Sequence, residues 1–238
     1  CGGDGHFLMV WTTGWHDRII GDSSSDDLMH WTPQRATPVM THDPTAKNAW
    51  APELFFDSAD SLYHILWAST VPGRHSPIQY SRREQGYNHR IYRTTTRDFE
   101  HFSPTELFFN PDFSVIDAAV LKHGSDYLLF LKNENPNPPE KNIRLTIGRD
   151  MQSPFPGEVS APITGEYWAE GPSPLQIGAY VYVYFDKYTE GRYGAVRSRD
   201  LQNWEDLSDR VVFPRNVRHG TAFKVPVKRL NTLFKSNL

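Results

Sequence analysis

The segment Ser198-Arg199-Asp200-Leu201-Gln202-Asn203-Trp204 carries a pattern that recurs along the chain. The pattern is a residue pair, an aspartate, an apolar residue, two further residues and an aromatic residue. Similar copies are Ser25–Trp31 and Thr96–Phe102, and a looser copy begins at Gly148 and reaches Phe155 with one extra residue. Self-similarity of this kind indicates a fold built from repeated units.

The spacing of the aspartates indicates the size of one unit. Asp27, Asp98, Asp150 and Asp200 are separated by 71, 52 and 50 residues. Blades of a β-propeller recur about every 40–50 residues. The first interval is longer, so we expect an insertion in the blade that precedes Asp98.

Alternating apolar segments precede these copies and predict β-strands. They are Phe7–Thr12, Leu62–Trp67, Tyr127–Leu131 and Tyr180–Phe185. A period of two with many Val, Ile, Tyr, Phe and Trp residues is typical of strands rather than helices. Only Val227–Asn237 has a helical rhythm, so the sequence predicts an all-β fold with a short C-terminal helix.

A third recurring element places a prominent side chain at the start of a short apolar strand. Its copies begin at Trp50, Asp117, Glu170 and His219, and each continues with Ala or Gly. The innermost strand of a propeller blade lines the central channel, so we expect these four side chains to face one axis. The strand at Phe7 is of the second type, which predicts five blades with the first inner strand missing at the N-terminus.

The length and composition of the chain fit one domain and indicate which kinds of partner it could bind. The 238 residues suffice for a single propeller domain over 1–238, incomplete at its N-terminus. The net charge of −3, without a block of like charge, predicts no nucleic-acid partner. No apolar run is long enough to span a membrane. Aromatic residues reach 13%, which is typical of sugar-binding clefts and also of aromatic β-cores.

The N-terminal residue is also the only cysteine, Cys1. A single cysteine supports neither a disulfide framework nor a cysteine-based metal site. Strand-like sequence follows almost at once, which leaves no tether for a lipid-anchored protein. We therefore interpret Cys1 as the end of a processed or truncated product.

Four motifs at the expected inner strands resemble glycoside hydrolase family 43, and the resemblance covers essentially the whole chain. They are Trp50-Ala51-Pro52-Glu53, Val115-Ile116-Asp117-Ala118, Glu170-Gly171-Pro172 and Arg218-His219-Gly220-Thr221. That family is a five-bladed β-propeller, mostly with α-L-arabinofuranosidase, β-xylosidase and arabinanase activity on plant cell-wall polysaccharides. The resemblance implies a glycosidase of polysaccharide degradation and, because its substrates are polymers, a secreted, periplasmic or cell-surface location.

The resemblance also implies roles for single residues. Glu170 would be the general acid, and Asp117 would orient it and tune its pKa. Trp50 resembles an aromatic residue that lines the sugar subsite. His219 resembles a histidine of the central channel that neighbours a bound calcium ion or its waters in many members. Calcium prefers oxygen ligands, so a structural calcium would contact His219 through water, and no cofactor is required.

Three further residues, Trp168, Arg144 and Glu53, are considered as candidates for the site. Trp168 precedes Glu170 by two residues, and we expect it to line the sugar site and to help desolvate the acid. Arg144 could reach a sugar or pair with an acid, and both alternatives stay open. Glu53 is an odd number of residues from Trp50, hence on the opposite face of the strand, and we interpret it as structural.

The family's general base is where the sequence departs from the pattern. That base is an aspartate, usually followed by proline, on the inner strand of the first blade. Asp4 resembles the hairpin turn after that strand, and Asp43-Pro44 lies in the wrong blade. The base is therefore expected upstream of Cys1.

The predicted chemistry is hydrolysis with inversion. Two carboxyl groups about 6.5–9.5 Å apart act on opposite sides of the sugar, and one of them must be protonated. We expect the like charge of Asp117 and the nearby aromatic rings to raise the pKa of Glu170. The favoured hypothesis is release of terminal α-L-arabinofuranosyl or β-xylosyl residues. The alternative is a non-hydrolytic or inactive glycan-binding propeller that lacks the catalytic base. Separately, Glu170 could cap backbone amides at a strand end, and Asp117 could be a buried turn residue that is hydrogen-bonded to its neighbours.

Overall fold

The computed structural model describes residues 6–75, 86–214, 217–227 and 230. Its regular elements are β-strands: β1 (Phe7–Thr12), β2 (Ile19–Ser25), β3 (Arg35–Pro38), β4 (Trp50–Asp57), β5 (Leu62–Ser69), β6 (Arg90–Thr96), β7 (Glu106–Phe109), β8 (Val115–His123), β9 (Asp126–Asn133), β10 (Ile143–Gly148), β11 (Glu170–Ile177), β12 (Tyr180–Lys187), β13 (Arg192–Ser198) and β14 (Glu205–Asp206). The predicted all-β class is therefore confirmed. No C-terminal helix is among these elements, and most of Val227–Asn237 lies outside the described residues. No helix formed by the described residues is long and apolar enough to cross a membrane.

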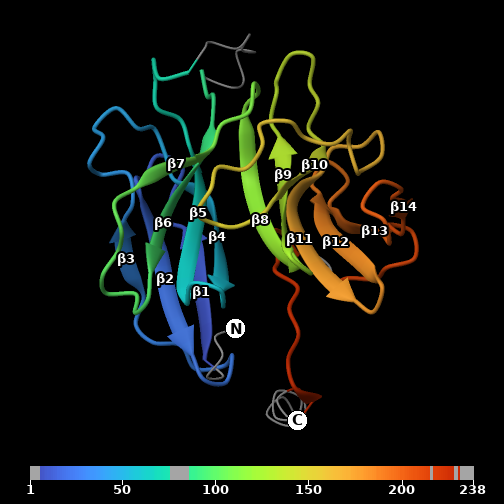
Figure 1. The fold of residues 1–238 in the computed structure, drawn as a ribbon, viewed down its shortest axis with the longest axis horizontal. Coiled ribbons are helices and arrows are strands. Elements are labelled where there is room, and N and C mark those ends of the chain that lie inside the picture. Colours follow the sequence, from blue (N-terminus) through green and yellow to red (C-terminus); the bar gives the residue numbers. More distant parts are fainter. Residues whose placement is uncertain (1–5, 76–85, 215–216, 228–229, 231–238) are drawn as a thin grey trace.

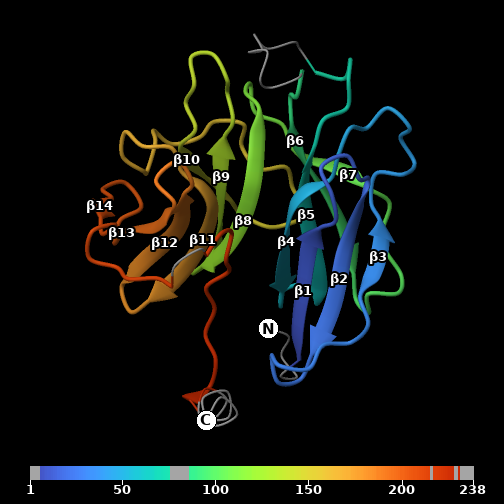
Figure 2. The ribbon, with the colours of Figure 1, turned by 180° about the vertical axis from the view of Figure 1, so that it is seen from behind.

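The strands form four antiparallel sheets that follow one another along the chain. Their orders are β1-β2-β3, β4-β5-β6-β7, β10-β9-β8 and β11-β12-β13-β14. Strand β4 contacts β8, and β8 contacts β11, so the first strands of these sheets are neighbours. Strands β3 and β14 lie at opposite outer edges of the molecule (Figure 1, and from behind in Figure 2). This arrangement of successive blades is that of a β-propeller.

The recurring aspartate closes the turn after the third strand of a blade. In the second blade, one carboxylate oxygen of Asp98 accepts the backbone N–H groups of Glu100 and His101 at 2.9 and 2.8 Å. The same pair of bonds is made by Asp27, Asp150 and Asp200. The apolar residue between, Phe99, has a positive φ of 58°. An aspartate suits this turn because its short side chain can satisfy nearby backbone donors.

The inner strands share a bulge at their beginning. The ladder shifts register between Trp50 and Glu53 in β4, and at the corresponding places in β8 and β11. Inside each bulge, one residue has a positive φ, and His219 is its counterpart in the C-terminal segment: Ala51 (47°), Asp117 (53°), Gly171 (59°) and His219 (43°). The predicted equivalence of the four motifs is thus wrong by one position, because Trp50 and Glu170 precede the bulged residue.

Strand β1 is the second strand of its blade, as the sequence predicts. Strand β1 is followed by the strand that leads to the Asp27 turn, as β12 is followed by β13 and the Asp200 turn. Within the described residues β1 pairs with β2 alone, whereas β12 pairs with both β11 and β13. Strand β1 is therefore a second strand. The strand predicted to begin at His219 is not formed: 219–223 has no regular structure, and its Ala222 N–H donates to Ser173 Oγ of β11 at 2.7 Å.

The hydrophobic core lies between neighbouring sheets. Leu66 and Ile91 of the second sheet pack with Leu129 of the third, and Phe130 of the third packs with Val183 of the fourth. Burial of each large apolar side chain contributes about 1.5–3 kcal/mol. These contacts hold neighbouring blades together and fix the starts of β8 and β11 beside one another.

Candidate active site

Three predicted residues meet at the start of two neighbouring inner strands and the C-terminal segment. His219 Nε2 lies 3.4 Å from Glu170 Oε1 and 3.6 Å from Asp117 Oδ2. The Gly171 N–H donates to Asp117 Oδ2 at 2.9 Å, which ties the two strands together. Asp117 is buried and Glu170 has a side chain that is 14% exposed. The site therefore brings two carboxyl groups and an imidazole into contact.

Gly171 permits this close approach. Its φ of +59° is a conformation that side-chain-bearing residues rarely adopt, and a Cβ at this position would lie 3.1 Å from the His219 ring. Glycine relieves both constraints because it has no Cβ. The dipeptide Glu170-Gly171 thus combines a functional side chain with a backbone that admits the imidazole.

Two cations that the sequence reading missed are paired with Glu170. Lys132 Nζ lies 3.0 Å from Glu170 Oε2, and Arg218 donates to Glu170 Oε1 at 2.9 Å. Arg218 also forms an ion pair with the buried Asp186. Arg218 stands directly before His219 in a quoted motif, and Lys132 is a lone cation at the end of an apolar strand. Both signals were present in the sequence, but neither states which acid the cation would reach.

The pKa of Glu170 is lowered, which is the opposite of our expectation. Burial acts to raise this pKa, but the hydrogen bond with His219 and the charges of Lys132 and His219 outweigh it and lower the pKa to about 2. The repulsion between the two carboxylates acts instead on the pKa of Asp117. Burial, with a contribution from Glu170, raises the pKa of Asp117. Glu170 is therefore ionised in the free protein at neutral pH.

The proton of this cluster is held by the imidazole. The negative charge of Asp117 raises the pKa of His219 to about 9, against the effect of burial and with further help from the hydrogen bond to Glu170. His219 is thus an imidazolium at neutral pH, next to an ionised Glu170. This pair can exchange one proton over 3.4 Å.

Glu170 opens onto a cleft with aromatic walls. The cleft has a volume of about 570 Å³, within the range of about 300–1,000 Å³ that is usual for ligand sites. Its lining residues are Trp15, His16, Trp50, Tyr87, His89, Lys132, Glu134, Lys141, Trp168, Glu170, Tyr188 and Thr189. Trp50 and Trp168, both predicted to contact substrate, lie in this lining. Trp50 packs on Tyr87 and His89 at 4.8 and 4.7 Å between ring centres.

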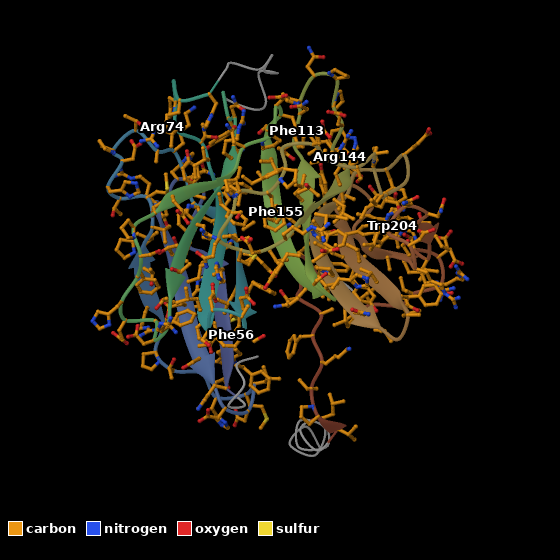
Figure 3. The ribbon with its side chains drawn as sticks, viewed as in Figure 1. Phe56, Arg74, Phe113, Arg144, Phe155 and Trp204 are labelled. Atoms are coloured by element: carbon orange, nitrogen blue, oxygen red, sulfur yellow. The ribbon has the colours of Figure 1, made fainter. Side chains whose placement is uncertain are left out.

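Arg144 does not reach this cleft. It projects from β10, the strand farthest from the channel in its sheet, and is labelled in Figure 3. Its guanidinium donates to Glu140 at 2.7 Å and to Asn142 at 3.0 Å. Of the two alternatives left open, the structure shows the second: Arg144 pairs with an acid. Its assignment to substrate binding is therefore corrected, because it is not among the residues that line the cleft. One strand, β9, separates it from the inner strand β8.

Glu53 faces the central channel rather than the opposite side of its strand. It lines a channel of about 300 Å³ together with Asp117 and His219. Burial raises the pKa of Glu53 to about 8. The expectation from strand parity is wrong because the bulge at Ala51 inserts one residue between Trp50 and Glu53, which reverses the alternation.

The cluster fits a calcium ion poorly in the arrangement described here. Calcium takes six to eight oxygen ligands, whereas Asp117, Glu170 and His219 offer two carboxylates and one imidazole within 4.8 Å of one another. Lys132 and Arg218 already neutralise Glu170, and a protonated His219 has no lone pair for a metal. A structural calcium in the channel stays a prediction, and no chemical step is derived through it.

Comparison with known proteins gives a family and a fold. The family described as “Probable glycosyl hydrolase domain”, related to glycoside hydrolase family 43, matches residues 11–231. An α-L-arabinofuranosidase of Bifidobacterium longum subsp. longum is 27% identical over 139 residues, covering 53% of this chain and 13% of that protein. The chain therefore spans about an eighth of the length of the curated relative it matches.

Solved structures share the fold at low sequence identity. The α-L-arabinofuranosidase from Lactobacillus brevis has a TM-score of 0.66 at 14% identity, over 86% of this chain and 69% of that one. The GH43 protein BlXynB from Bacillus licheniformis has a TM-score of 0.63 at 18% identity, over 85% of this chain and 39% of that one. A xylan β-1,4-xylosidase from Bacillus halodurans C-125 has a TM-score of 0.62 at 17% identity, over 85% and 39%. These likenesses show the fold alone.

Proposed function

The chain belongs to the glycosyl hydrolase family related to glycoside hydrolase family 43. From this premise we propose that the protein is an exo-acting, inverting glycosidase. The substrate would be a terminal α-L-arabinofuranosyl or β-xylosyl residue of a plant-type oligosaccharide or polysaccharide. The observation that carries the proposal is that Glu170, which lines the aromatic-walled cleft, contacts His219, which in turn lies next to Asp117 in the central channel. Because such substrates are polymers, we expect the protein to act outside the cytoplasm.

The cleft suits a neutral sugar. Trp50 and Trp168 present aromatic rings, whose faces pack against the apolar C–H groups of a sugar ring. The cations of the floor are paired, since Lys132 contacts both Glu134 and Glu170 and Lys141 contacts Glu134. Paired charges offer hydrogen bonds to hydroxyl groups without a net charge that would demand an ionic substrate.

Proton donation would use Glu170 and His219 together. An imidazolium next to a carboxylate holds the same single proton as an imidazole next to a carboxylic acid. A sugar that displaces water over Glu170 disfavours the charged pair, because desolvation penalises ions. The proton then passes from His219 to Glu170 and on to the glycosidic oxygen, as general acid catalysis requires. Asp117 positions this pair through Gly171 and His219.

The general base stays a prediction for a segment that precedes Cys1. Asp43, which mimics the base motif in letters, accepts hydrogen bonds from the backbone and side chain of Thr45 and pairs with Arg74 at 3.1 Å. It does not line the cleft. These contacts give Asp43 a structural role in the loop before β4.

The test is hydrolysis of aryl α-L-arabinofuranosides and β-xylosides by the full-length protein. Glu170→Gln should abolish release of a poor leaving group and should impair a good one, such as dinitrophenolate, much less, because a good leaving group needs little protonation. Glu190→Gln changes an exposed carboxylate in the β12–β13 turn and is the matched control. The anomer first seen by NMR reports inversion.

Two outcomes would count against this proposal. Equal rates for Glu170→Gln and the unaltered protein on poor leaving groups would remove Glu170 from the chemistry. Binding of the oligosaccharide without turnover by the full-length protein would support the non-hydrolytic, glycan-binding alternative.

A further inference from the structure

Trp15 combines high exposure with a fixed position at the cleft. It lies in the turn between β1 and β2, and its ring is 72% exposed, against 36% for Trp31. Its neighbours at the base of the same cleft, His89 and Lys132, are buried. Trp15 therefore stands at the mouth of the cleft, where its ring is open to a ligand.

The turn that carries Trp15 is held by several hydrogen bonds. Thr13 Oγ1 donates to Asp17 Oδ2 at 2.8 Å, and the Asp17 N–H donates to the Gly14 carbonyl at 3.5 Å. The Trp15 carbonyl accepts the Trp50 Nε1–H at 2.9 Å. These bonds fix the backbone of Trp15 beside Trp50.

Trp15 also extends a continuous aromatic wall from the base of the cleft to its mouth. His89 packs on Trp50 at 4.7 Å between ring centres, and Trp50 packs edge-to-face with Trp15 at 4.9 Å and 83°. Because Trp15 and Trp50 are nearly perpendicular, the wall turns at this point.

We propose that Trp15 forms a second sugar subsite, whose ring stacks on the neutral pentose unit linked to the sugar held over Glu170. This inference rests on the proposed function. In an exo-acting enzyme the terminal unit occupies the closed end of the cleft, so the next unit lies at the mouth. The aromatic face then covers the apolar face of that unit, and Trp15 sets the preference for longer substrates over single glycosides.

The test compares two substrates of the same sugar in the full-length protein. A glycosyl fluoride places nothing in the second subsite, whereas a trisaccharide places a sugar there. Trp15→Ala should lower the ratio of kcat/KM for the trisaccharide to that for the fluoride about tenfold, the scale of one aromatic contact. Trp15→Phe should restore most of the ratio. The backbone bond to Trp50 survives both changes.

Trp31→Ala is the matched control, because Trp31 is exposed but lines a different surface. It should leave the ratio as in the unaltered protein. An unchanged ratio in Trp15→Ala would overturn the proposal. So would equal losses for both substrates, which would indicate that Trp15 acts only by supporting Trp50.

A binding measurement separates this proposal from the proposed function. In the Glu170→Gln protein, the trisaccharide should quench a tryptophan fluorescence component that Trp15→Phe removes, and the free monosaccharide should not. If no glycoside is hydrolysed but this quenching occurs, the proposed function fails and the second subsite stands. If glycosides are hydrolysed and the quenching is absent, the second subsite fails alone.

Discussion

Replacement of His219 by asparagine should remove the proton that Glu170 donates. The pKa of His219 is raised from 6.5 to about 9, first by the charge of Asp117, so its protonated form is complete below 6.5 and is lost as pH rises through the raised value. The His219 side chain is 39% exposed, and water screens part of this effect. In the unaltered enzyme, kcat/KM should therefore stay level through neutral pH and fall as pH rises through about 9.

The size of the loss follows from where the proton must then reside. Without the imidazole, Glu170 must carry it alone. Burial then raises the pKa of Glu170 and Lys132 lowers it, so the ordinary value of 4.5 serves as the reference. At pH 7 about one molecule in 300 would then be protonated. We expect kcat/KM to fall by as much as about 300-fold at pH 7 and to recover as pH falls toward 4.5.

The assay is kcat/KM of the full-length protein from about pH 4 to about pH 10, with His101→Asn as control. His101 is an exposed histidine paired with Asp98, outside the cleft. An NMR titration of the His219 ring in the 238-residue chain tests the same pKa without turnover. A profile of the unaltered enzyme that already falls near pH 5 would refute the reasoning, since Glu170 would then be the titrating acid. A loss in His219→Asn that is equal at every pH would also refute it.

Two further predictions concern backbone and pairing. Gly171→Ala should destabilise the fold by about 1–2 kcal/mol in urea unfolding, because alanine is strained at a φ of +59° and its Cβ meets the His219 ring at 3.1 Å. Unchanged stability would show that this backbone relaxes. Arg144→Ala should cost about 1–3 kcal/mol through the lost contacts with Glu140 and Asn142, at unchanged kcat/KM. A fall in kcat/KM without a fall in stability would return Arg144 to the substrate site.

The blade repeat was predictable because its signal is local. Asp98 must accept the two N–H groups that follow it, so an aspartate recurs wherever this turn recurs. The alternating strands before it are equally local, since one face of each must be buried. From these two signals the sequence predicts the order of the blades, and the four sheets confirm it.

The register of the inner strands was not predictable in the same way. A bulge changes which face a side chain occupies, and residues as different as Ala51, Asp117 and Gly171 occupy the bulged position. No common residue type marks it. The sequence therefore aligned Trp50 with Asp117 although they differ by one position, and it placed Glu53 on the wrong face. Parity arguments hold only between bulges.

The charge state of the site depends on contacts between elements that are distant in sequence. Asp117 comes from β8 and Lys132 from β9, while Arg218 and His219 belong to a segment that follows the fourth sheet. Two carboxyl groups in one cleft predict a raised pKa only when no cation is nearer. Here the hydrogen bond with His219 and the charges of Lys132 and His219 lower the pKa of Glu170, so the repulsion from Asp117 is outweighed.

In the proposed mechanism, Glu170 passes on a proton although its own pKa is low. A carboxylate with a pKa of about 2 would be a poor proton donor if it acted alone. In contact with an imidazolium whose pKa is about 9, it can act as the route by which that proton reaches the leaving oxygen. The lysine and arginine then fix the carboxylate toward the cleft without supplying the proton. In the proposed mechanism the acid is therefore the pair of Glu170 and His219, and Asp117 would set its strength by raising the pKa of the histidine.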